Sequence, residues 1–220
     1  MKILTIDTSR DLCASLIKDT TSCHKIIDYI SRGHAERLIP QIKELLETSE
    51  LNINDIKLCA VNTGPGSFTG VRIGVAATRA FALSLNIQTI GVNMFSALAH
   101  IVISKVPSKS KKIIVLLKAH TNSYYYNFVS NTEAMYVTHT NIIDEQTLIE
   151  ILNTERPFII GDNADIFGTN TNCDYYIASD EEILYAIDAI AREAITKPTI
   201  PDYVTRPATP LYIIPYKTSP

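Results

Sequence analysis

Apolar and polar residues alternate in short runs along the first part of the chain and then change to a helical spacing. The runs at 2–7, 12–18 and 23–29 are apolar, are separated by polar turns, and predict three strands. Beyond them, apolar residues recur at intervals of three and four positions, which predicts a helix over 34–48. Because Pro40 has no backbone N–H to donate, we expect this helix either to kink or to begin late.

The same order of elements occurs twice along the chain. In the first half, the strands and the helix are followed by a strand at 56–61, a helix at 71–85, a strand at 88–92 and a helix at 95–103. The second half repeats three strands, a helix, a strand and a helix, at 113–117, 124–129, 134–138, 144–152, 158–161 and 182–195. Two successive β-β-β-α-β-α units predict an α/β fold made of duplicated ribonuclease-H-like halves.

A linker separates the two predicted halves. The stretch V-P-S-K-S-K at 106–111 has the composition of a connecting segment. We therefore expect an N-terminal lobe over 1–105 and a C-terminal lobe over 106–220. Prolines recur in the last part of the chain and exclude regular structure there, so this tail is expected to lie across the surface.

The sequence G-P-G-S-F-T-G-V-R-I-G at 64–74 holds four of the eight glycines in the chain and lies between a predicted strand and a predicted helix. Glycine-rich turns of this kind bring backbone N–H groups close to phosphate. The run nevertheless lacks the lysine of a Walker loop and the spacing of G-x-G-x-x-G. Ser67 and Thr69 are therefore interpreted as caps of the helix that follows, and no base can be assigned to Ser67 as a nucleophile.

A carboxylate at the end of the first strand is typical of two-lobed phosphotransferases, where two such acids hold hydrated Mg²⁺. Asp7 has this position, although an Asx turn is an equally good interpretation of it. In the second half Lys118 stands where the second acid is expected, and a lysine repels a divalent cation. We therefore expect only the remnant of a nucleotide loop, formed by Asp7, Thr8, Ser9, Gly64, Gly66, Ser67 and Gly70.

Composition and charge exclude several classes of function. The net charge of −3, with no long cluster of basic residues, argues against strong nucleic-acid binding by this chain alone. No signal peptide and no apolar run of membrane-spanning length is found, so the cytoplasm is the expected compartment. The five histidines lack the spacing of a zinc site, and no metal or cofactor is expected. Buried reduced thiols are expected at all four cysteines, Cys13, Cys23, Cys59 and Cys173.

The predicted helix over 71–85 is apolar nearly all round. Only Arg72, Thr78, Arg79 and Ser84 interrupt its apolar residues. A half of roughly 100 residues has too small a core to bury every side of such a helix, so we expect another chain to cover it. In this interpretation the glycine run directs a docking helix toward a partner.

Three segments, in this order and spacing, resemble the TsaB (YeaZ) family: I-L-T-I-D-T-S at 3–9, H-A-E-R-L-I-P at 34–40 and the glycine run at 64–74. The resemblance implies a non-catalytic member of the ASKHA superfamily of acetate kinase, sugar kinase, Hsp70 and actin. It implies a TsaD-like transferase and a TsaE-like ATPase as partners in making threonylcarbamoyladenosine beside the tRNA anticodon. Contact with tRNA would be indirect, and no membrane would take part.

The resemblance also implies a partner surface on the two N-terminal helices, 34–48 and 71–85. A second copy of the chain is expected to occupy this surface when the partner is absent. The second half departs from the family, because Lys118-Ala119-His120 replaces a usual Asp-Ala-Arg segment. The alternative function is an ATP-dependent small-molecule kinase or ATPase that uses Asp7. The residues expected to contact the partner are His34, Leu38, Gln41, Ile42, Leu45, Arg72, Val75, Thr78 and Arg79.

Overall fold

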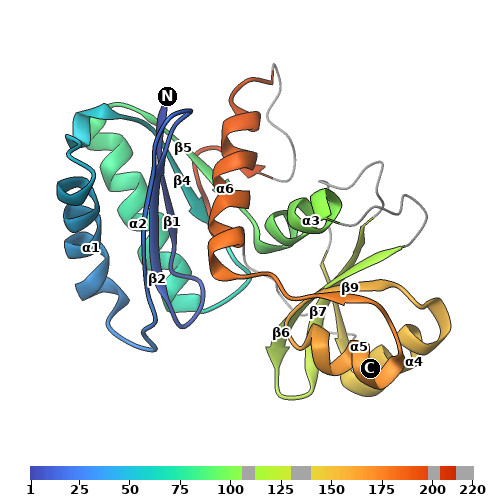
Figure 1. Cartoon of the computed structure of the whole chain (residues 1–220). Coiled ribbons are helices and arrows are strands. Elements are labelled where there is room, and N and C mark those ends of the chain that lie inside the picture. The colour runs from blue at the N-terminus through green and yellow to red at the C-terminus, as the bar shows by residue number, and fades with distance from the viewer. Residues whose placement is uncertain (106–111, 130–139, 198–203, 212–220) are drawn as a thin grey trace.

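Two β-sheets lie beside each other in the computed structural model of the chain, and helices pack on them (Figure 1). The structure describes residues 1–105, 112–129, 140–197 and 204–211. The strand predicted at 134–138 lies outside these residues. Within the described ranges, no helix is both long enough and apolar enough to cross a membrane.

The first sheet has six strands in the order β11-β5-β4-β1-β2-β3. Its centre is β1, which pairs antiparallel with β2 and parallel with β4. The remaining pairs are antiparallel for β2 with β3 and β5 with β11, and parallel for β4 with β5. The strands are β1 (Lys2–Asp7), β2 (Cys13–Lys18), β3 (Cys23–Asp28), β4 (Ile56–Asn62), β5 (Gln88–Val92) and β11 (Val204–Thr205).

Helices cover both faces of the first sheet. Helices α1 (His34–Thr48) and α2 (Phe68–Leu85) pack on the face to which Leu4 and Ile6 of β1 contribute. Helices α3 (Met94–Lys105) and α6 (Asp180–Ala194) share a core with Ile3 of the same strand. This alternation follows from the two-residue period of a strand. A short 3₁₀ helix, η1 (Ile53–Asp55), precedes β4.

Helix α1 has the bounds that the sequence predicts, but one of the two expected effects of Pro40 is wrong. It begins at His34 and continues through Pro40 as one helix, so the expected late start is wrong. Gly33, whose φ is +83°, occupies the N-cap position, and the amide of Arg37 donates to its carbonyl at 3.0 Å. The first turn is therefore complete before Pro40 is reached.

The second sheet has five strands in the order β10-β9-β6-β7-β8. Helices α4 (Glu145–Glu155) and α5 (Ala164–Thr171) pack on one of its faces. The amide of Thr147 donates to Asp144 Oδ1 at 2.9 Å, which confirms the predicted cap of α4. The strands are β6 (Ile113–His120), β7 (Ser123–Val129), β8 (Asn141–Asp144), β9 (Phe158–Gly161) and β10 (Tyr175–Tyr176).

The two sheets share a core through α3 and α6. One apolar cluster joins Ile3 and Leu58 of the first sheet to Val115 of the second, with Phe95 of α3 and Ile187 of α6 between them. Helix α6 and strand β11, although late in sequence, thus return to the first sheet. The division into an N-terminal lobe and a C-terminal lobe near residue 105 remains a prediction. Residues after this point contribute to the second sheet and, through α6 and β11, also to the first.

Candidate functional site

The glycine run packs directly on the turn that follows β1. The amide of Ser67 donates to the carbonyl of Ser9 at 2.7 Å, and Thr8 Oγ1 donates to the carbonyl of Gly70 at 2.7 Å. A Cβ atom at Gly66 would collide with the Ser9 carbonyl, and one at Gly70 would collide with the Thr8 carbonyl. Glycine is required at these two positions because the backbone of the other turn fills the space beside them.

Several polar groups of the glycine run are hydrogen-bonded within the chain. The amide of Gly64 donates to Asn62 Oδ1 at 3.0 Å, and the carbonyl of Gly64 accepts from the amide of Met94 at 2.8 Å. Ser67 Oγ accepts from the amide of Gly70 at 3.2 Å, which confirms Ser67 as the cap of α2. Thr69 lies inside α2, so its interpretation as a cap is wrong. These amides and carbonyls therefore hold the turn in place and do not face a ligand.

Asp7 is buried and belongs to a hydrogen-bonded network. Its Oδ1 accepts from the amide of Ser9 at 2.8 Å, the contact that defines an Asx turn. Its Oδ2 accepts from Asn62 Nδ2 at 3.1 Å and lies 3.8 Å from Nη2 of Arg10. Both carboxylate oxygens thus have partners in the chain, as the Asx-turn interpretation requires.

Beside the second sheet, the carboxylate of Asp162 lies at the position where the sequence analysis considered only Lys118. Lys118 is exposed, and its amide donates to Asp162 Oδ2 at 2.7 Å. Asp162 lies in the turn between β9 and α5, directly after Gly161, whose φ is +118°. Gly161 is needed there because a Cβ atom would collide with the carbonyl of Leu116. The Gly161-Asp162 pair directly after an apolar strand is the sequence feature from which this turn could have been predicted.

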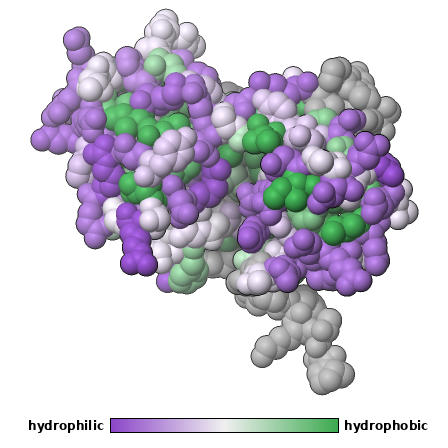
Figure 2. All heavy atoms as spheres, turned by 60° about the horizontal axis from the view of Figure 1, so that its bottom comes forward, coloured by the Kyte–Doolittle hydropathy of each residue, from purple (hydrophilic) through white to green (hydrophobic). Residues whose placement is uncertain are grey.

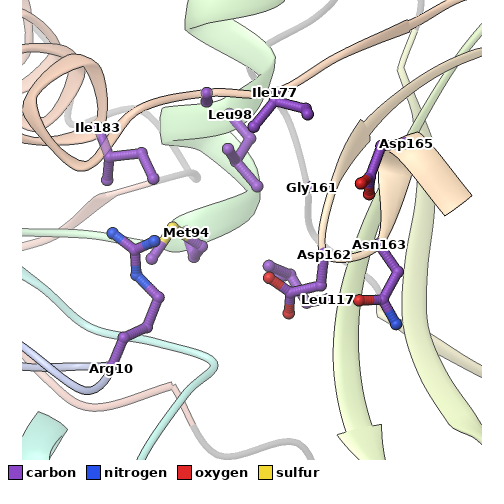
Figure 3. A pocket seen from close by; sticks show the side chains of 11 residues that line it. Arg10, Met94, Leu98, Leu117, Gly161, Asp162, Asn163, Asp165, Ile177 and Ile183 are labelled. Atoms are coloured by element: carbon purple, nitrogen blue, oxygen red, sulfur yellow. The ribbon is translucent and has the colours of Figure 1, made fainter.

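A cavity of about 260 Å³, here called the central cavity, opens between the two sheets (Figure 3). Arg10 reaches it from the β1–β2 turn, and Asp162 reaches it from the β9–α5 turn (Figure 3). The sequence analysis assigned no role to either residue. The other lining residues are Met94, Leu98, Leu117, Gly161, Asn163, Asp165, Ile177, Ala178 and Ile183. Within the described residues, no group of three His, Cys, Asp or Glu side chains is arranged to hold a metal ion.

The residues proposed from the sequence as the partner surface lie mostly inside the chain. Gln41, for example, accepts from Ser15 Oγ at 2.9 Å and donates to the carbonyl of Cys13 at 2.7 Å. Arg72 and Arg79 are exposed. Buried positions are His34, Leu38, Gln41, Ile42, Leu45, Val75 and Thr78. The apolar stripe of each helix therefore faces the first sheet, because a helix buries the face that carries most of its apolar area.

Other residues on the same helices carry exposed apolar area. Leu83 of α2 is 86% exposed, Phe68 of α2 is 57% exposed and Ile39 of α1 is 51% exposed. Ala76 and Ala80 of α2 are also exposed. Figure 2 shows apolar side chains among hydrophilic ones on the left part of the molecule, which carries both helices in Figure 1. We call Ile39, Phe68, Ala76, Ala80 and Leu83 the helical patch.

Burial separates the cysteines into two groups. It raises the pKa of the Cys13 thiol to about 11 and that of Cys59 to about 12. Cys173 is buried too, whereas Cys23 on β3 is exposed, so the expectation of a buried thiol is wrong at Cys23. Its Sγ lies 3.5 Å from the hydroxyl of Tyr185. The side chains of β3 alternate between exposed and half-buried positions from Cys23 to Ile26, as the two-residue period of a strand requires, and Cys23 has an exposed position.

Comparison with known proteins gives consistent results. The model of the family described as "TsaD: tRNA N6-adenosine threonylcarbamoyltransferase" matches residues 26–200, which is most of the chain. The protein named "tRNA threonylcarbamoyladenosine biosynthesis protein TsaB" of Escherichia coli K12 is 34% identical over 99 residues, covering 45% of this chain and 43% of that protein. The protein of the same name from Bacillus subtilis 168 is 37% identical over 100 residues, covering 45% and 44%. The chain thus spans about half the length of these curated relatives.

A solved structure supports the fold. YeaZ from Pseudomonas aeruginosa superposes with a TM-score of 0.69 at 18% identity, covering 96% of this chain and 99% of that one. At this identity the likeness concerns the fold alone. The predicted duplicated α/β fold of ASKHA type is confirmed, and so is the resemblance to the TsaB (YeaZ) family.

Proposed function

Because the chain belongs to the family described as tRNA N6-adenosine threonylcarbamoyltransferase, with curated relatives named TsaB, we propose that it is a non-catalytic subunit in the biosynthesis of threonylcarbamoyladenosine in tRNA. In this proposal it binds and activates a TsaD-like transferase and performs no chemistry itself. A TsaE-like ATPase would join the assembly, and tRNA would be contacted through the partner.

The observation that carries this proposal is the contact between the glycine run and the β1–β2 turn. A phosphate-binding loop must leave its amides free and its surface open to the ligand. Here the amide of Ser67 is bonded to the carbonyl of Ser9, and the Asp7 carboxylate is occupied by the Ser9 amide and by Asn62. The Ser67 amide and the Asp7 carboxylate, which would contact phosphate and Mg²⁺ in a nucleotide site, are thus bonded within the chain.

The exposed side of the two helices supports partner binding. The helical patch combines the apolar side chains of Leu83, Phe68 and Ile39 with the cation Arg72, whose guanidinium lies 3.8 Å from the centre of the Phe68 ring. Exposed apolar residues beside arginine are typical of the centre of protein interfaces. We propose that the patch, rather than the buried stripe, contacts the transferase. In the absence of the transferase, the same patch would pair with a second copy of the chain.

The test is assembly with a purified TsaD-like protein, measured by size-exclusion chromatography with light scattering. We expect a heterodimer with the native chain and none with Leu83→Glu, because a charge buried in an apolar contact must be desolvated. Ile166→Glu is the matched control, since Ile166 of α5 is 53% exposed and lies on the second sheet, away from the patch. A native chain that stays separate from the transferase contradicts the proposal.

The alternative function, an ATP-dependent kinase or ATPase, is tested by titrating the isolated chain with ATP and Mg²⁺ in a calorimeter. The scaffold proposal expects no saturable heat, because the Asp7 carboxylate already has partners in the chain. Binding that requires Mg²⁺ and is lost in Asp7→Asn would favour the enzyme. Asp55→Asn, an exposed acid before β4, serves as the control for a general effect of charge.

A further inference from the structure

The central cavity carries opposite charges on walls that face each other. Figure 3 shows Arg10 on the side of the first sheet and Asp162 on the side of the second sheet, across an open space. Asp165 lies on the same side as Asp162. Such an arrangement can bind a ligand that has both a negative and a positive group.

Arg10 is held in place without any ligand. Its Nη2 lies 2.7 Å from Asp180 Oδ1 at the start of α6 and 3.8 Å from Asp7 Oδ2. The side chain is still 30% exposed. A guanidinium has five N–H donors in a fixed plane. Nε and Nη2 of Arg10 are buried, so the donors that remain for a carboxylate are the two on Nη1.

Asp162 is also fixed by the fold. Its amide donates to the carbonyl of Leu116 at 2.9 Å, and its Oδ2 accepts from the amide of Lys118 at 2.7 Å. Both contacts tie the β9–α5 turn to strand β6. The carboxylate therefore stands at a defined place opposite Arg10 and needs no rearrangement to accept from a cation.

Apolar side chains form the floor between the charged walls. Met94, Leu98, Leu117 and Ile183 line the cavity, and none of them is more than 6% exposed. Cavities for drug-sized ligands have volumes of about 300–1,000 Å³. The volume of about 260 Å³ found here suits a smaller molecule with an apolar part.

We propose that the central cavity binds a small zwitterion of the α-amino acid class that has an apolar side chain. Its carboxylate is bound by Arg10, its ammonium group by Asp162, and its side chain packs on the floor of Met94 and Leu98. The lining carries one cation and two carboxylates, so a polyphosphate would meet net repulsion there. The site is separate from the helical patch and does not depend on the proposed scaffold function.

The decisive experiment varies the ligand and leaves the protein unchanged. The native chain is titrated with leucine and methionine, with leucinamide, which lacks the carboxylate, and with 4-methylpentanoate, which lacks the ammonium group. Because the chain has no tryptophan, calorimetry and ligand-observed NMR are the readouts. We expect leucine or methionine to bind and each truncated analogue to bind about tenfold more weakly or worse, since each loses a charged hydrogen bond.

A pair of variants locates the site. Asp162→Asn keeps an oxygen that can accept from the Lys118 amide but loses the charge, so we expect it to weaken leucine binding by about tenfold. Glu150→Gln removes an exposed charge from α4, outside the cavity, and is expected to bind as the native chain does. Equal binding of leucine and 4-methylpentanoate, or of leucine and leucinamide, overturns the proposal. So does the absence of binding by both amino acids at millimolar concentration.

Discussion

Thr8 Oγ1 donates a 2.7 Å hydrogen bond to the carbonyl of Gly70, which lies 62 positions further along the chain. This contact joins the end of β1 to the first turn of α2. Thr8 is 1% exposed, so the bond is made in a dry environment where an unpaired hydroxyl would be costly. The structural role of the glycine run is therefore to hold the turn after β1 against the start of α2, although the two are distant in sequence.

Gly70→Ala tests that function directly. The new methyl group would collide with the Thr8 carbonyl, and backbone cannot yield as a flexible side chain does. We expect a loss of about 2–4 kcal/mol in the free energy of unfolding, measured by urea denaturation. Ser84→Ala, at an exposed position of the same helix, is expected to change it by less than about 0.5 kcal/mol. If the Gly70→Ala variant is as stable as the native chain, the carbonyl of Thr8 does not lie against Gly70 as the structure has it.

The two sides of α2 should respond differently to a new charge. Val75 is 3% exposed, so Val75→Glu buries a carboxylate and is expected to cost about 3 kcal/mol or more, or to prevent folding. Leu83→Glu introduces the same group at a position that is 86% exposed, and the expected change is within about 0.5 kcal/mol. Circular dichroism during urea unfolding measures both. Similar losses in the two variants would contradict the assignment of faces.

Glu182 gives the protein a defined dependence on pH. Burial raises the pKa of this carboxyl, but hydrogen bonds from Lys105, the Ser179 amide and Tyr176 outweigh burial and lower the pKa from 4.5 to about 2. A lowered pKa in the folded state means that the stabilisation is present above pH 4.5 and is lost as the pH falls toward 2.

We therefore expect Glu182→Gln to be less stable than the native chain by about 1–2 kcal/mol at neutral pH. The difference should shrink between pH 4.5 and pH 2, as thermal melts in matched buffers would show. Glu150→Gln, an exposed acid on α4, controls for the general loss of charge. If the stability difference between Glu182→Gln and the native chain does not change with pH, the Glu182 carboxylate does not have the stabilising hydrogen bonds and the ion pair with Lys105 that the structure shows.

Thiol reactivity should distinguish Cys23 from the other cysteines. A thiolate is the reactive form, and burial raises the pKa of Cys13 and Cys59 to about 11 and 12, so neither reacts readily at pH 8 in the folded state. Ellman's reagent should modify one thiol per native chain and all four after denaturation. Cys23→Ser should remove the fast reaction. Rapid modification of more than one thiol in the native protein would contradict the described burial.

Much of the fold was predictable because it depends on neighbours in sequence. Alternating apolar residues located β1, β2 and β3, the capping residues Ser67 and Asp144 marked the starts of α2 and α4, and repetition of the pattern indicated a duplicated fold. Local backbone preference and side-chain periodicity decide these features. Strands β8, β10 and β11 and helix α5 were missed, since short elements carry few periods of the pattern. Strand β11 also shows that the expectation of no regular structure in the proline-rich tail is wrong at Val204 and Thr205.

The candidate site was predicted less well, because long-range contacts form it. The spacing of apolar residues predicted that Leu38 and Val75 lie on helices. Only the packing of α1 and α2 on the first sheet decided that these two residues are buried and that Leu83 is exposed. The meeting of Arg10 and Asp162 likewise depends on how α3 and α6 hold the two sheets. The sequence alone determined the order of the helices and strands from β1 to α3 and the strand-to-helix turn at the glycine run. The tertiary structure decided what that turn touches, because contact between distant backbones depends on the path of the whole chain.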